Sequence, residues 1–356
     1  STGERAVTLV LGNGQAHVTY ATATTVTAGL GTVSASGVIS VPATGAESLG
    51  GTLGSGGVSL TVSNQAGVTQ SIVLAPAAAP VAAPSRLSNL SIRSLAGAGA
   101  QTLIVGLNIG GQGTDTSAKS VLFRGVGPSL AQFGVSGVLA DPGLKIFAGS
   151  RQVDSNEDWG GAAAIRDAAV ALGAFPFVGA TSRDAALNTA NMPGSYTMQL
   201  SGAAGSTGIV LAEIYDATDS DRFSAKTPRF TNISARTQVG LGGDILIAGF
   251  VIAGTRSQTV LVRAVGPTLA QFGVSGSLAD PQLRLYSGAT KLAANDDWEG
   301  DNLLEAASAA VGAFPLPVGS KDSMLLMTLA PGSYTVQVSG AGAATGVALV
   351  EIYEVP

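Results

Sequence analysis

Three oxygen-bearing side chains in the first half of the chain have the spacing of a calcium loop. In DSNEDWGG (residues 154–161), Asp154, Asn156 and Asp158 occupy alternate positions, so that a tight loop could direct their oxygens to one ion. The same stretch is also typical of an acidic turn after a strand, in which Trp159 folds back over the core. The sequence favours the turn, with calcium as the alternative.

A second acidic stretch, AANDDWEGD (residues 293–301), repeats this pattern incompletely. It keeps Asn295 and Asp297 and adds Asp301, but Ala293 replaces the first acidic residue. An ion site copied together with its surroundings should keep its ligands. The partial loss favours the turn in both copies, and no cofactor other than calcium is indicated.

Charged residues also interrupt apolar strand-like runs. Arg124 and Arg263 end VLFR and VLVR, while Glu213 and Glu351 lie within LAEIY and LVEIY. A charge in an apolar strand needs a partner, and a guanidinium with a carboxylate is the natural pair. We expect one structural bridge per copy, Arg124 with Glu213 and Arg263 with Glu351. A catalytic role is disfavoured, because no second carboxylate keeps a fixed spacing to either glutamate.

Several other chemistries have no residues to carry them. The chain has no cysteine and one histidine, His17. This excludes thiol chemistry, zinc sites of the Cys/His kind and a Ser–His or Cys–His pair within the repeated part. The glycine-rich GVGPS and AVGPT lack the lysine and the helix start of a phosphate-binding loop. We therefore predict no catalytic residues, and the protein is not expected to be an enzyme.

These pairs of motifs belong to an internal duplication. RGVGPSLAQFGVSGVLADP (residues 124–142) recurs as RAVGPTLAQFGVSGSLADP (residues 263–281), and PGSYTMQLSG recurs as PGSYTVQVSG. The small differences in length between copies fall in loops, as a duplicated domain predicts. We assign residues 86–216 to repeat 1 and 229–356 to repeat 2.

The periodicity within each repeat indicates a β-sandwich with one short helix. In SYTMQLSG, Tyr196, Met198 and Leu200 alternate with polar residues, as in a half-buried strand. The alanine-rich segments 162–173 and 302–312 instead have helical spacing and end in glycine. Residues 217–228 are polar, end in proline and are interpreted as a linker between the repeats.

The first part of the chain differs from the repeats. Residues 1–74 contain short Val/Thr/Leu runs separated by Gly, Ser and Asn, which predicts a small all-β domain of the immunoglobulin-like type. Residues 75–85 are a Pro/Ala linker. The first run is an ordinary first strand or, alternatively, a strand donated to another copy; it consists of Arg5, Ala6, Val7, Thr8, Leu9, Val10 and Leu11.

The repeats resemble a known module of secreted bacterial proteins. The blocks NDDW, LAPGSYTVQVSG and TGVALVEIY (within residues 295–353) are similar to the pre-peptidase C-terminal type of jelly-roll domain, which often occurs in tandem in large extracellular proteins. The resemblance covers both repeats but not residues 1–74. It implies two jelly-roll-like sandwiches and an extracellular or cell-surface location in a bacterium, and it supplies no reaction.

Composition then bears on the partners. The net charge is −5, only 12% of residues are charged, and the mean hydropathy is +0.37. This offers no basic surface for nucleic acid, and no apolar run reaches the ~18 residues that span a bilayer. Low charge favours a protein that covers its surface with copies of itself. We expect a non-enzymatic, self-assembling structural protein of the filament or surface-layer kind; the alternative is an adhesive or carbohydrate-binding module.

Overall fold

The computed structural model describes residues 5–11, 15–21, 26–34, 36–44, 47–54, 57–64, 69–74, 84–219 and 222–356. Contacts divide the chain into two compact units, Ser1–Val81 and Ala82–Pro356. Most of the expected Pro/Ala linker, residues 75–83, lies outside the described residues. The protein is mostly β-structure in antiparallel sheets, which confirms the all-β fold class.

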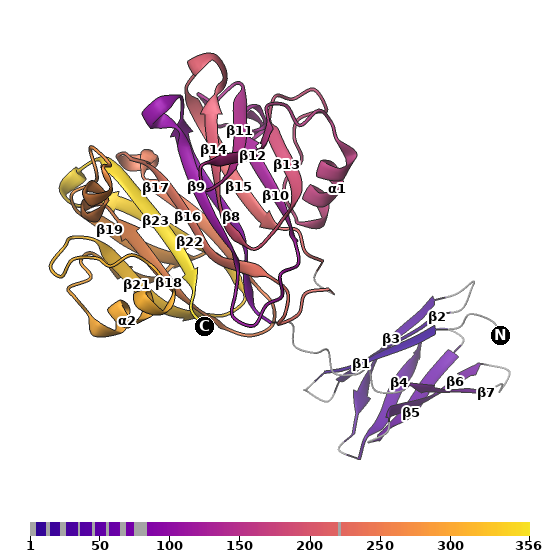
Figure 1. The fold of residues 1–356 in the computed structure, drawn as a ribbon. Coiled ribbons are helices and arrows are strands. Elements are labelled where there is room, and N and C mark those ends of the chain that lie inside the picture. Colours follow the sequence, from indigo (N-terminus) through magenta and orange to yellow (C-terminus); the bar gives the residue numbers. More distant parts are fainter. Residues whose placement is uncertain are drawn as a thin grey trace. The chain divides into compact units, whose positions relative to one another are not determined.

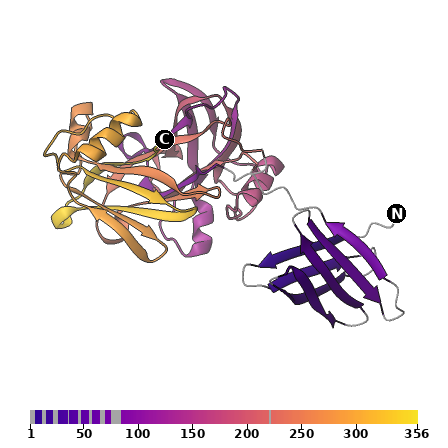
Figure 2. The same cartoon turned by 90° about the horizontal axis from the view of Figure 1, so that it is seen from below.

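The first unit is one sheet whose strands pair in chain order (Figure 2). Its strands are β1 (Arg5–Leu11), β2 (Gln15–Ala21), β3 (Val26–Val33), β4 (Val38–Thr44), β5 (Glu47–Gly54), β6 (Gly57–Asn64) and β7 (Thr69–Leu74). An immunoglobulin-like domain instead has two sheets with Greek-key connections. The prediction of that type was wrong in topology, because short glycine-rich connections such as residues 12–14 favour hairpins between neighbours.

The candidate donor strand lies in this first sheet. β1 pairs antiparallel with β2, from Arg5 opposite Ala21 to Leu11 opposite Gln15. The structure therefore gives residues 5–11 the ordinary role of a first strand. Donation to another copy stays a prediction.

The second unit contains both repeats, each with the same order of elements. Repeat 1 comprises β8 (Arg86–Ala96), β9 (Leu103–Gly110), β10 (Lys119–Val126), β11 (Pro142–Ala148), β12 (Arg151–Asn156), α1 (Ala163–Ala171), β13 (Ala185–Asn191), β14 (Gly194–Gly202) and β15 (Gly208–Asp216). Repeat 2 comprises β16 (Arg229–Val239), β17 (Leu246–Ala253), β18 (Gln258–Val265), β19 (Pro281–Ser287), β20 (Thr290–Asn295), α2 (Asn302–Ala310), β21 (Ser323–Leu329), β22 (Gly332–Gly340) and β23 (Gly346–Glu354).

The two repeats share their sheets (Figure 1). One row of strands runs β12-β11-β14-β9-β16-β23-β18-β21, and the other runs β20-β19-β22-β17-β8-β15-β10-β13. Each row therefore crosses from one repeat to the other, at β9–β16 and at β8–β17; we call these two pairings the seam. Apolar side chains of both rows, such as Leu107 and Phe250, meet in one core cluster.

The seam changes the expected division into domains. Repeats 1 and 2 form one compact unit rather than two separate sandwiches, because the inner edge strands of each repeat hydrogen-bond to the other repeat. The expected linker 217–228 is packed as well: Phe223 is buried, and the guanidinium of Arg86 lies 3.9 Å from the centre of its ring. Residues 220–221 lie outside the described part.

The two helices cover the outer faces of the sheets, on opposite sides of the unit (Figures 1 and 2). α1 packs Ala169 against Leu122 of β10. α2 packs Ala307 near Leu261 of β18 and Met324 of β21. These helices match the alanine-rich segments predicted from the sequence. Each packs against the strand that carries the buried arginine of its repeat.

Candidate functional site

Both predicted arginine–glutamate bridges are confirmed. Arg124 Nη1 lies 3.0 Å from Glu213 Oε2, on the neighbouring strands β10 and β15. Arg263 Nε lies 3.3 Å from Glu351 Oε2, on β18 and β23. Both arginines are fully buried. Charges so deeply buried must be paired. Each bridge therefore links two neighbouring strands of a sheet.

The bridge in repeat 1 has more partners than the bridge in repeat 2. Arg124 Nη2 donates to the carbonyl oxygen of Phe175 at 2.8 Å, and the guanidinium lies over the rings of Phe175 and Phe177. Among the described residues, Arg263 lies over one ring, that of Phe314, and none of its three guanidinium nitrogens has a hydrogen-bond partner with good geometry. The same bridge is therefore better satisfied in repeat 1.

The two glutamates are also bound by tyrosines. The hydroxyls of Tyr215 and Tyr353 donate to Glu213 and Glu351, each at 2.7 Å. Burial raises the pKa of both glutamates, against the lowering effect of the paired arginine and tyrosine. Burial, reinforced by the neighbouring glutamate, raises the pKa of both tyrosines as well. The tyrosines thus stay neutral donors and complete a structural network.

A second buried ion cluster was missed from the sequence. Asp216 Oδ1 lies 2.7 Å from Lys119 Nζ, and Asp216 Oδ2 lies 2.8 Å from Arg86 Nε. All three side chains are almost completely buried. Burial lowers the pKa of Lys119, although Asp216 opposes this. The corresponding pair of repeat 2 is Arg229 with Glu354, and Gln258 occupies the place of Lys119.

The repeated RGVGPSL block is organised by an aspartate that the sequence reading did not single out. Asp184 is fully buried and accepts hydrogen bonds from the amides of Gly127 and Ser129 and from the hydroxyls of Ser129 and Ser182. The spacing S-x-D, repeated at residues 182–184 and 320–322, is the signal that could have revealed it.

The second copy of the block is held in the same way. Asp322 accepts from the amide of Gly266 at 2.7 Å and from the hydroxyls of Thr268 and Ser320. A Cβ on Gly266 would lie 2.2 Å from the carbonyl oxygen of Leu278, so this position requires glycine. The block is therefore a tight backbone crossing that a buried carboxylate fixes in both repeats.

The acidic turns are also structural. Asn156 donates through Nδ2 to the carbonyl of Asp158 and accepts through Oδ1 from the amide of Ala186, both at 2.9 Å. Asn295 does the same with Asp297 and with the amide of Met324. Asn156 thereby links the turn after β12 to the backbone of β13, and Asn295 links the turn after β20 to the backbone of β21.

The remaining predicted calcium ligands have other partners. Asp154 accepts from the amide of Ser155, and Asp301 caps α2 by accepting from Leu303 and Leu304. Asp297 pairs with Lys321 at 2.5 Å. No group of three or more His, Cys, Asp or Glu among the described residues is arranged to hold a metal ion. The structure shows the expected turn in both repeats, with Trp159 and Trp298 as its buried lids, and calcium binding stays a prediction.

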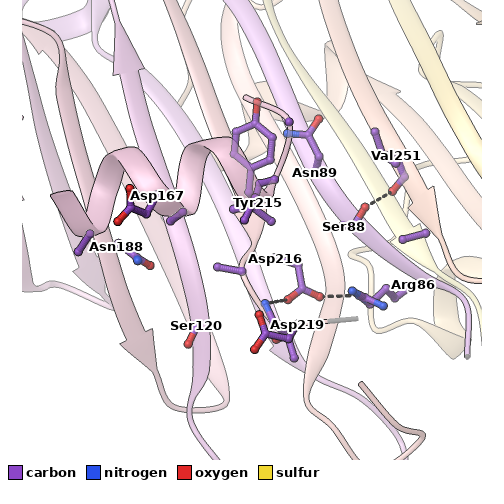
Figure 3. Close-up of a pocket in the computed structure, with 18 residues that line it drawn as sticks. Arg86, Ser88, Asn89, Ser120, Asp167, Asn188, Tyr215, Asp216, Asp219 and Val251 are labelled. Atoms are coloured by element: carbon purple, nitrogen blue, oxygen red, sulfur yellow. Dashed lines mark hydrogen bonds and ion pairs between the residues drawn. The ribbon is translucent and has the colours of Figure 1, made fainter. Parts of the chain in front are cut away.

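A polar groove of about 960 Å³ lies between α1 and the strands at the seam (Figure 3). Its floor carries Arg86 and Asp216, and its walls carry Asn188 of β13 and Asp167 of α1. Repeat 2 contributes Val251 and Ala253 of β17, and Ser88 donates to the carbonyl of Val251 at 3.4 Å. Both repeats are therefore needed to build it.

A second groove of about 550 Å³ occupies the equivalent place in repeat 2. Arg229 and Glu354 replace Arg86 and Asp216, and repeat 1 now contributes Asn108 and Gly111. The two grooves are related as the repeats are. Polar and apolar side chains line both grooves together.

Comparisons with known proteins do not identify this chain. No protein family matches, and no curated protein matches. Two crystal structures of PNGF-II, in different space groups, align over 100% of this chain and 92% and 91% of theirs, at 7% and 9% identity and TM-scores of 0.19 and 0.20. Similarity at that level carries no argument about function. Among the described residues, no helix is both long and apolar enough to cross a membrane.

Proposed function

We propose that the protein is a non-enzymatic structural protein of the bacterial cell exterior that assembles with copies of itself into a filament or surface layer. The observation that carries this proposal is the seam: two copies of one sandwich are already joined edge to edge through both sheets. A fold that associates in this way within one chain has the geometry to associate between chains.

The charge distribution supports the same proposal. Only 12% of the residues are charged, and many of the charged groups in the second unit, including Arg124, Arg263 and Lys119, are consumed in buried pairs. A low charge gives little electrostatic repulsion between copies. The location outside the cell rests on the resemblance of the repeats to modules of secreted proteins.

Negative-stain microscopy combined with sedimentation over a concentration series tests the proposal. We expect ordered filaments or sheets whose abundance rises with concentration. A chain lacking residues 1–11 tests strand donation, and it should assemble less if β1 is donated. Monodisperse single chains at every concentration would contradict self-assembly.

Carbohydrate binding is a second candidate, favoured by the groove of Figure 3. Isothermal titration with chito- and cello-oligosaccharides measures it directly. The variant Ser120→Trp fills the groove, while Lys145→Trp places the same side chain on β11, outside the groove residues. Binding that is lost only in Ser120→Trp supports the candidate, and binding that is absent or equal in both variants removes it.

A further inference from the structure

One outer edge of the second unit differs from the other three. The outer edges are β12, β13, β20 and β21. β12 (RQVDSN) and β20 (TKLAAN) carry charges, and β13 (AALNTAN) carries two asparagines. β21 (SMLLMTL) has neither a charge nor an amide side chain nor a proline. Natural sheets protect exposed edges with charges and prolines. Both β13 and β21 lack these residues, and β21 is the more apolar of the two.

The backbone of β21 presents hydrogen-bonding groups on its free side. Among the strands that the structure describes, β21 pairs only with β18. The amide of Met324 donates instead to Asn295 Oδ1, so it points away from β18. Because backbone groups alternate along a strand, the N–H and C=O groups of Leu326 and Thr328 point to the same free side. They form a short template for another strand.

The side chains of β21 suit such pairing. Leu325 and Met327 pack on the main core and Leu326 packs on the α2 cluster, yet all three remain partly exposed. Thr328 is the one residue of β21 whose side chain is exposed, and its hydroxyl forms a hydrogen bond with the hydroxyl of Thr259 on β18. A neighbouring strand would cover the remaining apolar surface on both faces of the sheet at once.

We propose that β21 pairs antiparallel with β21 of a second copy of this chain, with Met327 opposite Met327, so that the free backbone groups of Leu326 pair with those of Thr328 of the other copy. The occupant is a second copy because the strand is complementary to itself under a two-fold axis: both edges are uncharged and offer the same alternating donors and acceptors. The seam supplies the precedent, since there the same sandwich pairs its edges antiparallel with its own duplicate.

This inference rests on the proposed self-assembly and names the contact that begins it. A two-fold contact closes a pair of chains, so a filament adds a second kind of contact to these pairs. The first step of assembly is therefore a dimer that extends one row of strands continuously through two chains.

Thr328→Lys and its matched control test the proposal. The lysine places a charge on the free edge without entering the core, since Thr328 is exposed; Thr328→Glu repeats the test with the opposite sign. Ala190→Lys makes the same change at the corresponding exposed position of β13. Circular dichroism and thermal melting confirm that each variant folds. Sedimentation velocity then measures the dimer dissociation constant.

We expect both Thr328 variants to raise that constant at least tenfold and Ala190→Lys to leave it unchanged. Amide hydrogen exchange should show protection of Leu326 and Thr328 in the parent protein that the variants lose. If the parent associates but the Thr328 variants associate equally, or if Ala190→Lys weakens association as much, the β21 contact is overturned while self-assembly stands. If the parent is monomeric throughout, both are overturned.

Discussion

Repeats 1 and 2 use one framework but satisfy its buried charges to different degrees. Arg124 in repeat 1 has a carbonyl acceptor and two phenylalanine rings besides its glutamate, whereas Arg263 in repeat 2 has one ring and a longer contact to Glu351. The backbone crossing held by Asp184 or Asp322 is nearly the same in both. The duplication has thus kept the devices that fix backbone geometry, while the surroundings of the charges have diverged.

The largest expected effect comes from breaking one bridge. Arg124→Met and Arg263→Met each leave a buried glutamate without its partner and should cost about 3–5 kcal/mol of unfolding free energy. Guanidinium denaturation measures this loss. An unchanged midpoint in either variant would show that the bridge adds nothing to stability.

Removing both partners sharpens the comparison between the repeats. Arg263→Met with Glu351→Leu should recover most of the lost stability, because well-packed apolar residues often replace a buried pair without cost. Arg124→Met with Glu213→Leu should recover less, since the carbonyl of Phe175 loses its donor. Equal recovery in the two repeats would remove the distinction drawn here.

The aspartates of the repeated block should show the smallest difference between repeats. Asp184→Ala and Asp322→Ala each orphan buried donors and should cost about 3 kcal/mol, with the loss somewhat larger in repeat 1, where one more amide is bound. Urea denaturation of the two variants, with the exposed substitution Asp167→Ala as control, checks this. A loss of stability smaller than that of the control would show that the backbone crossing is stable without the aspartate.

Lys119, whose place in repeat 2 is taken by Gln258, gives a pH-dependent prediction. Burial lowers the pKa of Lys119, so the folded state loses its proton before the unfolded chain does. Stability therefore rises with pH from the folded pKa up to the ordinary value of 10.5. Lys119→Gln, which installs the residue of repeat 2, removes that rise. The difference between the melting temperatures of parent and variant should change from pH 7 to pH 10; a constant difference would contradict a lowered pKa of Lys119.

The smallest expected effect is that of calcium. Because the oxygens of Asn156 and Asn295 are already engaged by backbone amides, adding calcium or a chelator should leave the melting temperature unchanged. Magnesium serves as the control for ionic strength. A rise in melting temperature with calcium alone would restore the ion site, and Asp154→Ala and Asp301→Ala would then assign it to one repeat.

Local patterns allowed part of this structure to be predicted. Alternation in SYTMQLSG gave β14, in which Met198 and Leu200 are buried, and isolated charges in apolar runs gave both bridges. The seam could not be predicted, because periodicity shows which face of a strand is buried but not which strand lies beside it. Asp184 and Asp322 were missed because they lie in loops, where neither periodicity nor an apolar context makes a carboxylate conspicuous.

The seam also constrains how the chain is made. During synthesis, repeat 1 emerges before repeat 2, so β8 and β9 must wait with one side unpaired until β17 and β16 arrive. A fragment that ends after repeat 1 keeps both edges open, and two such fragments can complete each other by pairing β8 of one with β9 of the other. The intact chain is in this sense a dimer whose two halves are tied together by a covalent connection, so its halves always meet at equal concentration and in the correct order.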